Sequence, residues 1–471
     1  MKKIAIIGGG ISGLSAAYTL EKARLAGSPL EYRLFEASPR LGGVLLTEHV
    51  AGCVVEAGPD SFLTEKSWAV DFCREIGLGD QLITSKDSIR KTYIYLKGQL
   101  IPMPDGLAFM VPTKIWPIVF SPLFSLNTKM RMAREWLSSS PSAQNGEPGS
   151  GPNDESVADF ITRHYGREMV DRLADPLLSG VYGGSASELS VRAVLPRFVE
   201  MEAKFGSLSK GMVSARKKAL NSSSPPVFTS LRGGMQQMAD AVAEKIPPSS
   251  LRTNTRIDSL RCESGQWTIS TNGESERFGA VVLAAPAHAA ASMLQISSPD
   301  LAKELREIPY SSSVTVAMGF DQTSLASLPT GFGFLVPRSE NKNIMAVTFV
   351  HQKFPGRAPA GMGLLRCFLG GTHNDQLLAL NEDAIQKIVR EELRQNLGLD
   401  AEPLFTGIFK WKNAMAQYTV GYARRMENIQ RLAAQIPCFA LAGNAYSGIG
   451  VPDCIRSGQN AAQQVLTALS R

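Results

Sequence analysis

The N-terminal segment carries glycines at the spacing that binds the phosphates of a dinucleotide. Gly8 and Gly10 follow the apolar run 4–7 and let the backbone turn tightly and approach a pyrophosphate, while Gly13 lets the next helix pack on the strand. The positive end of that helix would face the phosphates. Glu36 ends a second apolar run, where its carboxylate can accept hydrogen bonds from a ribose diol. This order of features predicts a dinucleotide-binding βαβ unit and redox chemistry.

Two further observations favour a flavin over a nicotinamide cofactor. Only one such fingerprint occurs in the 471 residues, and the five histidines show no motif that would supply an acid or base. A tightly held flavin needs no such residue, because its own ring accepts the hydride. Arg40, Gly42 and Gly43 would place a cation and two points of close approach near the pyrophosphate. The C-terminal segment 443–455 ends in a helix whose N-terminus would point at an electron-rich flavin carbonyl.

Composition sets broad limits on the class of protein. The length and the 44% apolar content suit two or three domains. The net charge of +6 is mild and no long basic run occurs, so nucleic acid is not an expected partner. The six cysteines form no CxxC pair, which predicts neither a disulfide framework nor a metal site and fits a reducing cytoplasm best. The apolar stretch after Lys3 runs straight into the glycine motif, so we expect no signal peptide.

Two segments do not fit a simple pattern of strands and helices. Residues 107–126 are apolar but are broken by Pro112, Pro117 and Pro122, which argues against a membrane-spanning helix. We favour packed protein core there over contact with a membrane surface. Residues 138–156 are rich in Gly, Pro and Ser and predict a mobile surface loop, after which helical patterning resumes at Val157.

The second half of the chain changes to β patterning. A helix is expected over about 236–245, followed by strands at 256–258, 267–270 and 280–286. Residues 310–370 predict a separate, mostly antiparallel sheet that would form a substrate domain. A short buried strand at 438–444 and an amphipathic helix at 455–470 then close the chain. The nucleotide domain would thus be assembled from three separated segments.

Six segments, in this order, resemble the FAD-dependent porphyrinogen oxidases of haem synthesis, a branch of the flavin amine oxidase superfamily. They are EASPRLGG (36–43), GPDSFL (58–63), DPLLSGVYGG (175–184), FGFLVP (332–337), FPGRAP (354–359) and GNAY (443–446). Amine oxidases and carotenoid desaturases share the first and last of these but not the middle ones. The resemblance runs over nearly the whole chain.

The resemblance implies an α/β fold in three parts. These are a discontinuous Rossmann-like FAD domain (1–85, 226–290 and 436–471), a mixed-sheet substrate domain (86–100 and 291–435), and an α-helical domain (101–225) of a type that contacts membranes in this family. The residues expected to hold FAD are Gly8, Gly10, Ile11, Ser12, Gly13, Glu36, Ala37, Arg40, Gly42, Gly43, Gly58, Pro59, Asp60, Ser61, Ile257, Ala285, Gly443, Asn444, Gly450, Val451 and Pro452.

By the same resemblance, a flat cavity in front of the flavin would receive the porphyrinogen. Gly180 and Val181 would lie beside the macrocycle, and Phe332, Gly333, Leu335 and Phe368 would line the cavity. These residue types make physical sense. A large apolar ring that bears carboxylates needs flat apolar walls, close backbone approach and cations at the rim.

The cations at the rim bear on the choice of substrate. Family members that act on protoporphyrinogen often carry an arginine just before the strand 93–95, whereas this chain has Thr92 there, with Arg90 and Lys91 upstream. Lys66 matches a lysine that members using coproporphyrinogen place near the substrate. We therefore favour coproporphyrinogen III, which has four carboxylates, over protoporphyrinogen IX, which has two. Solvated surface charge is the alternative for each of these basic residues.

The activity implied is a six-electron oxidation of a porphyrinogen in three rounds, each reducing one molecular oxygen to hydrogen peroxide. Protons would leave through pyrrole tautomerisation, so no catalytic side chain is required. A membrane surface at the inner face of the cell membrane, a downstream ferrochelatase and a second copy of the chain are possible partners. The alternatives are an amine oxidase or desaturase-like flavoenzyme, a non-catalytic flavoprotein that binds porphyrin and, least favoured, a nicotinamide oxidoreductase.

Overall fold

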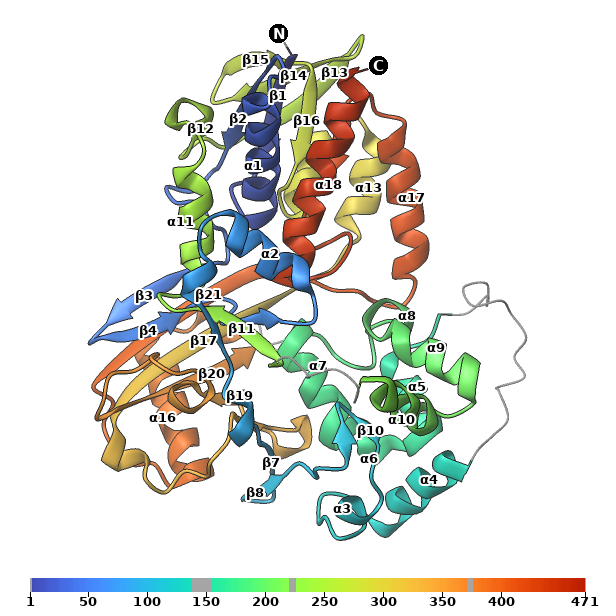
Figure 1. Ribbon diagram of the computed structural model, residues 1–471, viewed down its shortest axis with the longest axis vertical. Coiled ribbons are helices and arrows are strands. Elements are labelled where there is room, and N and C mark those ends of the chain that lie inside the picture. Colours follow the sequence, from blue (N-terminus) through green and yellow to red (C-terminus); the bar gives the residue numbers. More distant parts are fainter. Residues whose placement is uncertain (1, 138–153, 220–225, 371–375, 471) are drawn as a thin grey trace.

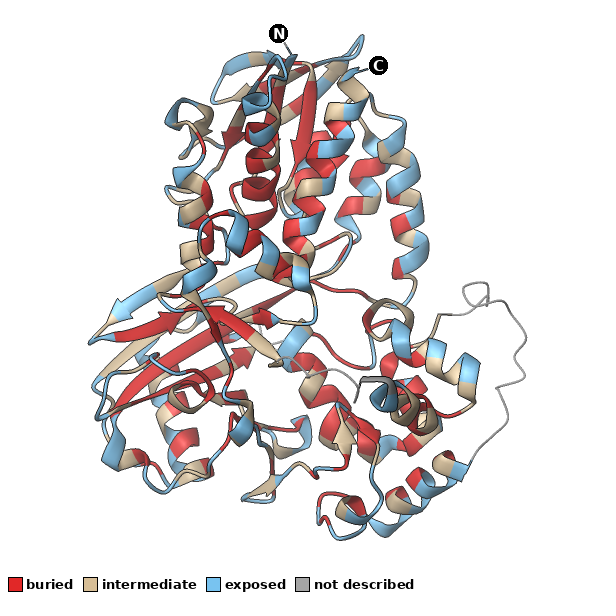
Figure 2. Cartoon of the chain, viewed as in Figure 1, coloured by how far each residue is buried: buried red, intermediate tan, exposed pale blue. Residues whose placement is uncertain are grey.

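The computed structural model describes residues 2–137, 154–219, 226–370 and 376–470. The first of its sheets has five strands, all parallel to one another (Figure 1). The strand order is β12-β2-β1-β16-β22. The strands are β1 (Lys2–Ile7), β2 (Leu30–Phe35), β12 (Leu251–Arg252), β16 (Ala280–Leu283) and β22 (Phe439–Leu441). They come from three stretches of chain far apart in sequence. The sheet is buried on both faces, as its continuous apolar runs require, and Figure 2 shows this buried layer.

Helices and a small sheet cover the two faces of the parallel sheet. Ile4 and Ile6 pack with α1 (Ile11–Leu25), α11 (Gln236–Glu244) and α18 (Val451–Ser470), whereas Ala5 and Ile7 belong to the core on the opposite face. That opposite core includes an antiparallel sheet and two helices. These elements are β13 (Ser259–Glu263), β14 (Gln266–Thr271), β15 (Glu274–Phe278), α12 (Ala287–Leu294) and α13 (Pro299–Arg306).

A second, seven-stranded sheet has the order β21-β17-β20-β19-β18-β7-β8. All its pairs are antiparallel except β18 with β7, which confirms the mostly antiparallel sheet predicted within 310–370. One face packs on α16 (Glu382–Leu397). The strands are β7 (Thr92–Leu96), β8 (Gln99–Pro102), β17 (Tyr310–Asp321), β18 (Gly333–Leu335), β19 (Ile344–Phe349), β20 (Met362–Gly370) and β21 (Phe405–Ala416).

Between residues 101 and 219 the described chain is mainly helical. Helix α5 begins at Val157, as predicted, because the Ser156 hydroxyl accepts a hydrogen bond from the Asp159 N–H and caps the first turn. The helical elements of this region are α3 (Trp116–Val119), α4 (Leu126–Leu137), α5 (Val157–Tyr165), α6 (Arg167–Met169), the π-helical turn Val170–Ala174, α7 (Asp175–Tyr182), α8 (Val191–Val194), α9 (Pro196–Phe205) and α10 (Leu208–Ala219). Most of the predicted loop 138–156 lies outside the described residues.

Shorter elements join these bodies. They are α2 (Ser67–Glu75), α14 (Val350–Lys353), α15 (Gln376–Ala379), α17 (Tyr422–Ala434), β3 (Thr47–Val50), β4 (Cys53–Glu56), β5 (Phe62–Leu63), β6 (Leu82–Thr84), β9 (Leu107–Ala108), β10 (Val111–Pro112) and β11 (Phe228–Leu231), with 3-10 turns at 79–81, 87–89, 248–250, 322–325 and 338–340. Helix α7 lies between the seven-stranded sheet and the other helices of the region 101–219 (Figure 1).

Two predictions about local structure were wrong in part. The strand expected at 256–258 does not form, because residues 254 and 255 bond to the backbone of Glu36 and Ser38 and Asn254 takes a left-handed φ of 52°. Core packing over 107–126 holds for residues such as Met110 and Leu123 but fails for the exposed side chains of α3 and its flanks. Hydrophobicity alone does not distinguish these exposed side chains from the buried ones.

Candidate active site

The glycine turn leaves an open space in front of α1. A side chain at Gly8 would stand 2.6 Å from the Ala284 carbonyl oxygen, beside half-buried Ala285, and one at Gly13 would overlap the Gly8 carbonyl. Gly10, by contrast, has no heavy atom within 4 Å of the position a side chain would take. No side chain caps α1 at Gly10, so the N–H groups of its first turn, from Ile11 onward, face this space. The arrangement suits a pyrophosphate.

Glu36 lies at the end of β2, beside the glycine turn. Its two carboxylate oxygens accept hydrogen bonds from the Gly9 N–H at 2.7 Å and the Ser38 N–H at 2.8 Å. Each oxygen keeps a further lone pair for a ribose hydroxyl. Ala37 is exposed next to it, and Ile257 is buried on the segment that crosses Glu36. The acid therefore stands where a nucleoside next to the pyrophosphate would lie.

The loop that holds Gly42 and Gly43 is pressed against the glycine turn. The Gly42 N–H donates to the Gly9 carbonyl at 2.8 Å, and a side chain at Gly43 would lie 3.1 Å from the Gly10 Cα. Both glycines have positive φ, at 103° and 60°. The Arg40 guanidinium donates to the carbonyls of Leu41, Gly43 and Leu45. Arg40 thus braces the loop, and these donors are committed to backbone rather than left free for a phosphate.

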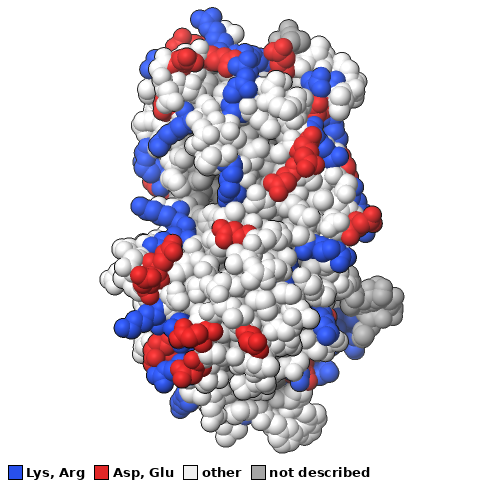
Figure 3. Space-filling model, turned by 90° about the vertical axis from the view of Figure 1, so that its left-hand side faces the viewer, with Lys and Arg blue, Asp and Glu red and all other residues white. Residues whose placement is uncertain are grey.

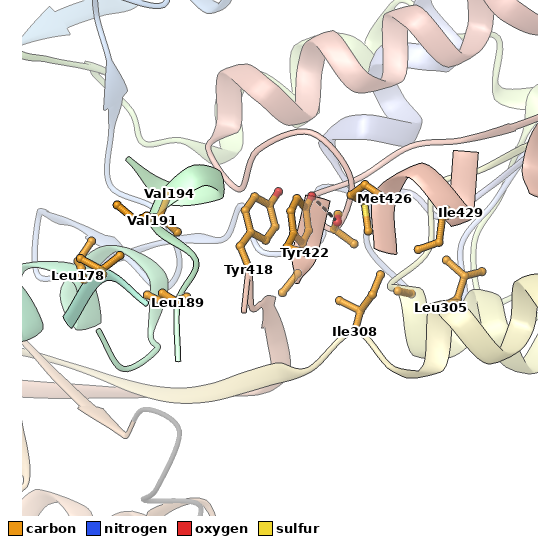
Figure 4. Packing of buried hydrophobic residues seen from close by; sticks show 14 of the residues in the cluster. Leu178, Leu189, Val191, Val194, Leu305, Ile308, Tyr418, Tyr422, Met426 and Ile429 are labelled. Carbon is orange, nitrogen blue, oxygen red and sulfur yellow. Dashed lines mark hydrogen bonds between the residues drawn. The ribbon is translucent and has the colours of Figure 1, made fainter. Parts of the chain in front are cut away.

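Two stacked tyrosines hold the loop between β22 and α18. The rings of Tyr418 and Tyr422 lie side by side (Figure 4), and their centroids are 4.0 Å apart. The Tyr418 hydroxyl donates to the Asn444 carbonyl at 2.8 Å and accepts the Gly448 N–H at 2.7 Å, and the Tyr422 hydroxyl donates to the Ala445 carbonyl at 3.0 Å. Sequence reasoning missed both tyrosines, because nothing in their local sequence marks them as partners of this loop.

The same loop carries Tyr446, a half-buried residue whose hydroxyl group is buried. The hydroxyl of Tyr446 has no hydrogen bond to any of the described residues. Burial raises the pKa of Tyr446 well above its usual range, so the hydroxyl stays protonated. Because an unsatisfied buried hydroxyl is costly, it indicates an acceptor or donor on a bound group. Gly443, with φ of 134°, begins this loop, and its N–H donates to the Ser457 hydroxyl at 3.1 Å.

Helix α18 begins at Val451, directly after Gly450, four residues earlier than predicted. A side chain at Gly458 would overlap the Ser12 carbonyl, so α18 lies directly against α1. The Lys66 amine contacts both oxygens of Asp453, in the first turn of α18, at 2.7 and 2.5 Å. The Pro452 carbonyl accepts the indole N–H of Trp68 at 2.7 Å. Lys66 is therefore engaged at the start of α18.

Segment 56–61 contributes two carboxylates to a group of buried charged side chains. We call this group the buried charged cluster and define it as Glu56, Asp60, Lys353, Arg357 and Arg366. Lys353 contacts Asp60 at 2.8 Å, and Arg357 contacts Glu56 at 3.0 Å. Burial alone would raise the pKa of Asp60, but the charges of Lys353 and Arg366 outweigh it and hold that pKa far below its usual range. Burial raises the pKa of Glu56 despite its arginine. The two acids lie near the N-terminus in sequence, at positions 56 and 60, and the three basic residues lie about 300 positions later, within 353–366.

Neighbouring groups extend this charged cluster. The Asp60 carboxylate also accepts the Ser61 hydroxyl at 2.6 Å, and Arg366 donates to the Gly58 carbonyl. A side chain at Gly58 would overlap the Val44 carbonyl, and Pro59 joins that turn to Asp60. Lys353 and Arg366 were not predicted. The signal that could have found Arg366 is a lone charge within the apolar residues 364–369 of β20.

One face of the seven-stranded sheet brings together most of the predicted substrate residues. Directly paired residues of adjacent strands share a face. Thr92 pairs with Gly333, and Leu335 pairs with Ala346, which pairs with Phe368. Leu335 and Phe368 are half-buried. Phe332 lies just before β18, is buried, and donates its N–H to the Lys91 carbonyl at 2.8 Å.

Helix α7 faces the same rows. The side-chain position of Gly180 lies 3.9 Å from a Leu335 methyl, and Gly180 and its neighbour Val181 are exposed, Val181 to 53%. The end of α7 is anchored by Gln417, whose amide donates to the Tyr182 carbonyl at 2.7 Å. An apolar wall on the sheet and a helix with a bare backbone thus stand opposite each other, next to the tyrosine-held loop.

The remaining basic residues lie at the edge of this wall. Arg90 is half-exposed and pairs with Asp87 at 3.4 Å, and Lys91 is exposed. The structure therefore brings Arg90 and Lys91 to the start of β7 and β18, whereas Lys66 is held at the start of α18. Among the described residues no group of three or more potential ligands could hold a metal ion, and none of the described helices is long and apolar enough to cross a membrane.

Comparison with known proteins agrees with this arrangement. Residues 11–466 match the family described as flavin containing amine oxidoreductase. The chain is 33% identical to coproporphyrinogen III oxidase of Bacillus subtilis (strain 168), over 99% of this chain and 98% of that one. It is 29% identical to mitochondrial protoporphyrinogen oxidase of Nicotiana tabacum, over 99% and 94%.

Solved structures share the fold. A protein from Exiguobacterium sp. 255-15, provisionally named protoporphyrinogen oxidase, superposes with a TM-score of 0.88 at 31% identity over 100% of this chain and 99% of that one. Cyclohexylamine oxidase from Brevibacterium oxydans has a TM-score of 0.73 at 17% identity over the full length of both chains, and shows the fold alone. The chain therefore belongs to the flavin-containing amine oxidoreductase family, and FAD is its cofactor.

Proposed function

We propose that this chain oxidises a porphyrinogen, coproporphyrinogen III, to the corresponding porphyrin in haem synthesis. The observation that carries the proposal is the packing of α7 on the seven-stranded sheet, where exposed Gly180 lies against Leu335 and the row that continues to Phe368. The ring would enter at this junction, which we call the slot. A flat apolar ring needs two such walls and a close backbone approach. The names of the relatives in Bacillus subtilis and Nicotiana tabacum support the same reaction class.

The residues present fit FAD. The open space at Gly10 and the uncapped first turn of α1 would receive the pyrophosphate, and Glu36 would bind the ribose. The unpartnered hydroxyl of Tyr446 offers a hydrogen bond on the side of the tyrosine-held loop. When bound, FAD supplies the hydride-accepting chemistry and returns the electrons to molecular oxygen.

The protein's own part in the reaction is binding and orientation. Leu335 and Phe368 would hold one face of the ring, and the bare backbone at Gly180 would allow the other face to come close. Both walls exclude water from the reacting carbon. Holding the ring in one orientation lowers the entropic cost of reaching the transition state. No side chain needs to move a proton, because the pyrrole nitrogens release protons by tautomerisation.

The preference for coproporphyrinogen III rests on charge. Arg90 and Lys91 lie at one edge of the slot and can face substrate carboxylates. Lys66 contributes less to this argument than its position in the sequence suggests, since Asp453 occupies it. A substrate with four carboxylates gains more from basic groups at the rim than one with two.

The test is aerobic turnover of purified, flavin-loaded protein. We expect porphyrin fluorescence to rise faster from coproporphyrinogen III than from protoporphyrinogen IX, with one hydrogen peroxide per two electrons. A Gly180→Leu variant fills the slot and should lose turnover while it keeps its flavin absorbance. An amine oxidase would instead oxidise primary amines and neither porphyrinogen, and a porphyrin carrier would bind porphyrin without producing peroxide.

We also propose that this chain works in the cytoplasm and contacts the inner membrane surface through an apolar patch, defined as Ile115, Trp116, Val119, Phe120 and Leu126. These side chains are exposed, Trp116 to 72% and Phe120 to 80%, and the two rings stack at 6.2 Å. Exposed aromatic and aliphatic groups on short elements suit the interface of a bilayer. Figure 3 shows a face of mixed charge whose lower end is largely uncharged.

Vesicle flotation tests the membrane proposal. The double variant Trp116→Ser/Phe120→Ser should lower partitioning onto anionic phospholipid vesicles at least about tenfold, because two large side chains lose apolar contact. Ile296→Ser, which removes an exposed side chain elsewhere, is the matched control and should change nothing. Equal partitioning of all three proteins would refute the proposal. A ferrochelatase that takes up the porphyrin and a second copy of the chain are further proposed partners.

A further inference from the structure

Arg338 stands three residues beyond Leu335, at the end of the apolar wall. Its Nε contacts an Asp175 carboxylate oxygen at 2.9 Å, and its side chain is 44% exposed. Asp175 is the first residue of α7 and is itself buried. Its other carboxylate oxygen accepts hydrogen bonds from the Ala186 N–H at 2.8 Å and the Ser185 hydroxyl at 3.3 Å. Asp175 is therefore fixed from two sides and holds the guanidinium in one place.

The Asp175 contact leaves the outer half of the guanidinium free. The ion pair is made through Nε, and the two Nη groups of Arg338 donate no hydrogen bond to the described residues. These groups form a planar fork that matches a carboxylate in a bidentate geometry. The anchoring removes much of the side-chain entropy that an exposed arginine would lose on binding. Arg338 is thus prepared for a second carboxylate.

Arg338 lies at one end of the apolar wall, and Arg90 and Lys91 lie at the other end. The Lys91 carbonyl accepts a hydrogen bond from the N–H of Phe332, the residue just before β18. Arg338 lies three residues after the end of the same strand. The chain between 332 and 338 spans at most about 20 Å at 3.3 Å per residue. Helix α7 runs alongside, with Gly180 at Leu335 and Asp175 at Arg338. Basic residues therefore lie beyond both ends of this strand, Arg90 and Lys91 beside its start and Arg338 after its end.

We propose that Arg338, positioned by Asp175, binds a carboxylate on the side of the porphyrinogen ring that protoporphyrinogen leaves uncharged. The inference rests on the proposed function and deepens it. Coproporphyrinogen III bears propionates around the whole ring, whereas protoporphyrinogen IX carries both of its propionates on one side and vinyl groups on the other. Cations at both ends would accommodate the tetracarboxylate, whereas the Nη groups of Arg338 would face no substrate carboxylate when the dicarboxylate binds.

The experiment compares both substrates on Arg338→Gln, Arg338→Lys and the wild-type holoenzyme. Loss of a charge-assisted hydrogen bond should lower kcat/KM for coproporphyrinogen III about 10- to 100-fold in Arg338→Gln and leave that for protoporphyrinogen IX within about threefold. Arg338→Lys should recover part of the loss. Arg394→Gln, an exposed arginine paired with Glu391 on α16, is the matched control and should change neither value. The ratio of kcat/KM for coproporphyrinogen III to kcat/KM for protoporphyrinogen IX does not depend on how much of each preparation is folded.

A second readout needs no turnover. Coproporphyrin III should bind Arg338→Gln about tenfold more weakly than wild type, measured by the shift of the porphyrin absorption band, while protoporphyrin IX binding stays unchanged. Equal losses for both substrates, or no loss for either, would overturn the role of Arg338 and leave the proposed function intact. A wild-type protein that oxidises neither porphyrinogen would instead overturn the proposed function.

Discussion

The ion pair between Asp60 and Lys353 should be the most sensitive point of the buried charged cluster. Their side chains are 16% and 11% exposed, and the pair joins segment 56–61 to the end of α14 at 2.8 Å. At an effective dielectric constant of ~20, this separation corresponds to about 6 kcal/mol of attraction, and Arg366 at 4.0 Å adds about 4 kcal/mol. Desolvation offsets much of this. Lys353→Met leaves a buried carboxylate with only its weaker partner, so we expect a loss of about 3–5 kcal/mol in the free energy of unfolding.

The assay is urea unfolding at fixed FAD concentration, because a ligand that binds the folded state changes apparent stability. Asp60→Asn and the double variant complete a double-mutant cycle. The double variant should be less destabilised than the sum of the two single variants by at least about 1 kcal/mol, since it removes both charges of the Asp60–Lys353 pair together. Lys22→Met, which breaks an exposed pair with Glu75, should cost less than about 1 kcal/mol. Additive single effects, or a Lys353→Met loss as small as that of the control, would refute the reasoning.

The other predictions concern the cofactor site and the response to pH. Gly13→Val should abolish flavin retention, measured as the ratio of flavin to protein absorbance, because its side chain would overlap the Gly8 carbonyl and displace α1. Glu36→Gln should weaken FAD binding about tenfold in equilibrium dialysis, through loss of charged acceptors for the ribose. Burial opposes charging of His164, but the carboxylates of Glu135 and Glu202 outweigh it and raise its pKa. The stability that His164 contributes is therefore complete below pH ~6.5 and is lost as pH rises through the raised pKa. Thermal melts from pH 6 to 9 should show the wild type converging on His164→Gln, and parallel curves would contradict this.

Local sequence determined much of the cofactor half of the protein. The glycine turn, the first strands and the helix after Gly8 follow from apolar periodicity and from glycines at positions that no other residue can occupy, such as Gly8 with φ of 108°. The same reasoning located Glu36 at the end of β2. These features depend on residues close together in the chain, so their spacing carries the information.

Tertiary structure alone decided which distant residues meet. The pairing of Lys66 with Asp453 joins positions 387 residues apart, and Lys353 with Asp60 joins positions 293 apart. Nothing local marks such partners, because a lysine looks the same in sequence whether it is solvated or paired. Hydrophobicity likewise could not separate buried Leu123 from exposed Phe120, since both are apolar and only packing decides which one finds neighbours. The packing of α7 on the seven-stranded sheet, where we place the substrate, likewise forms only once segments far apart in the chain come together.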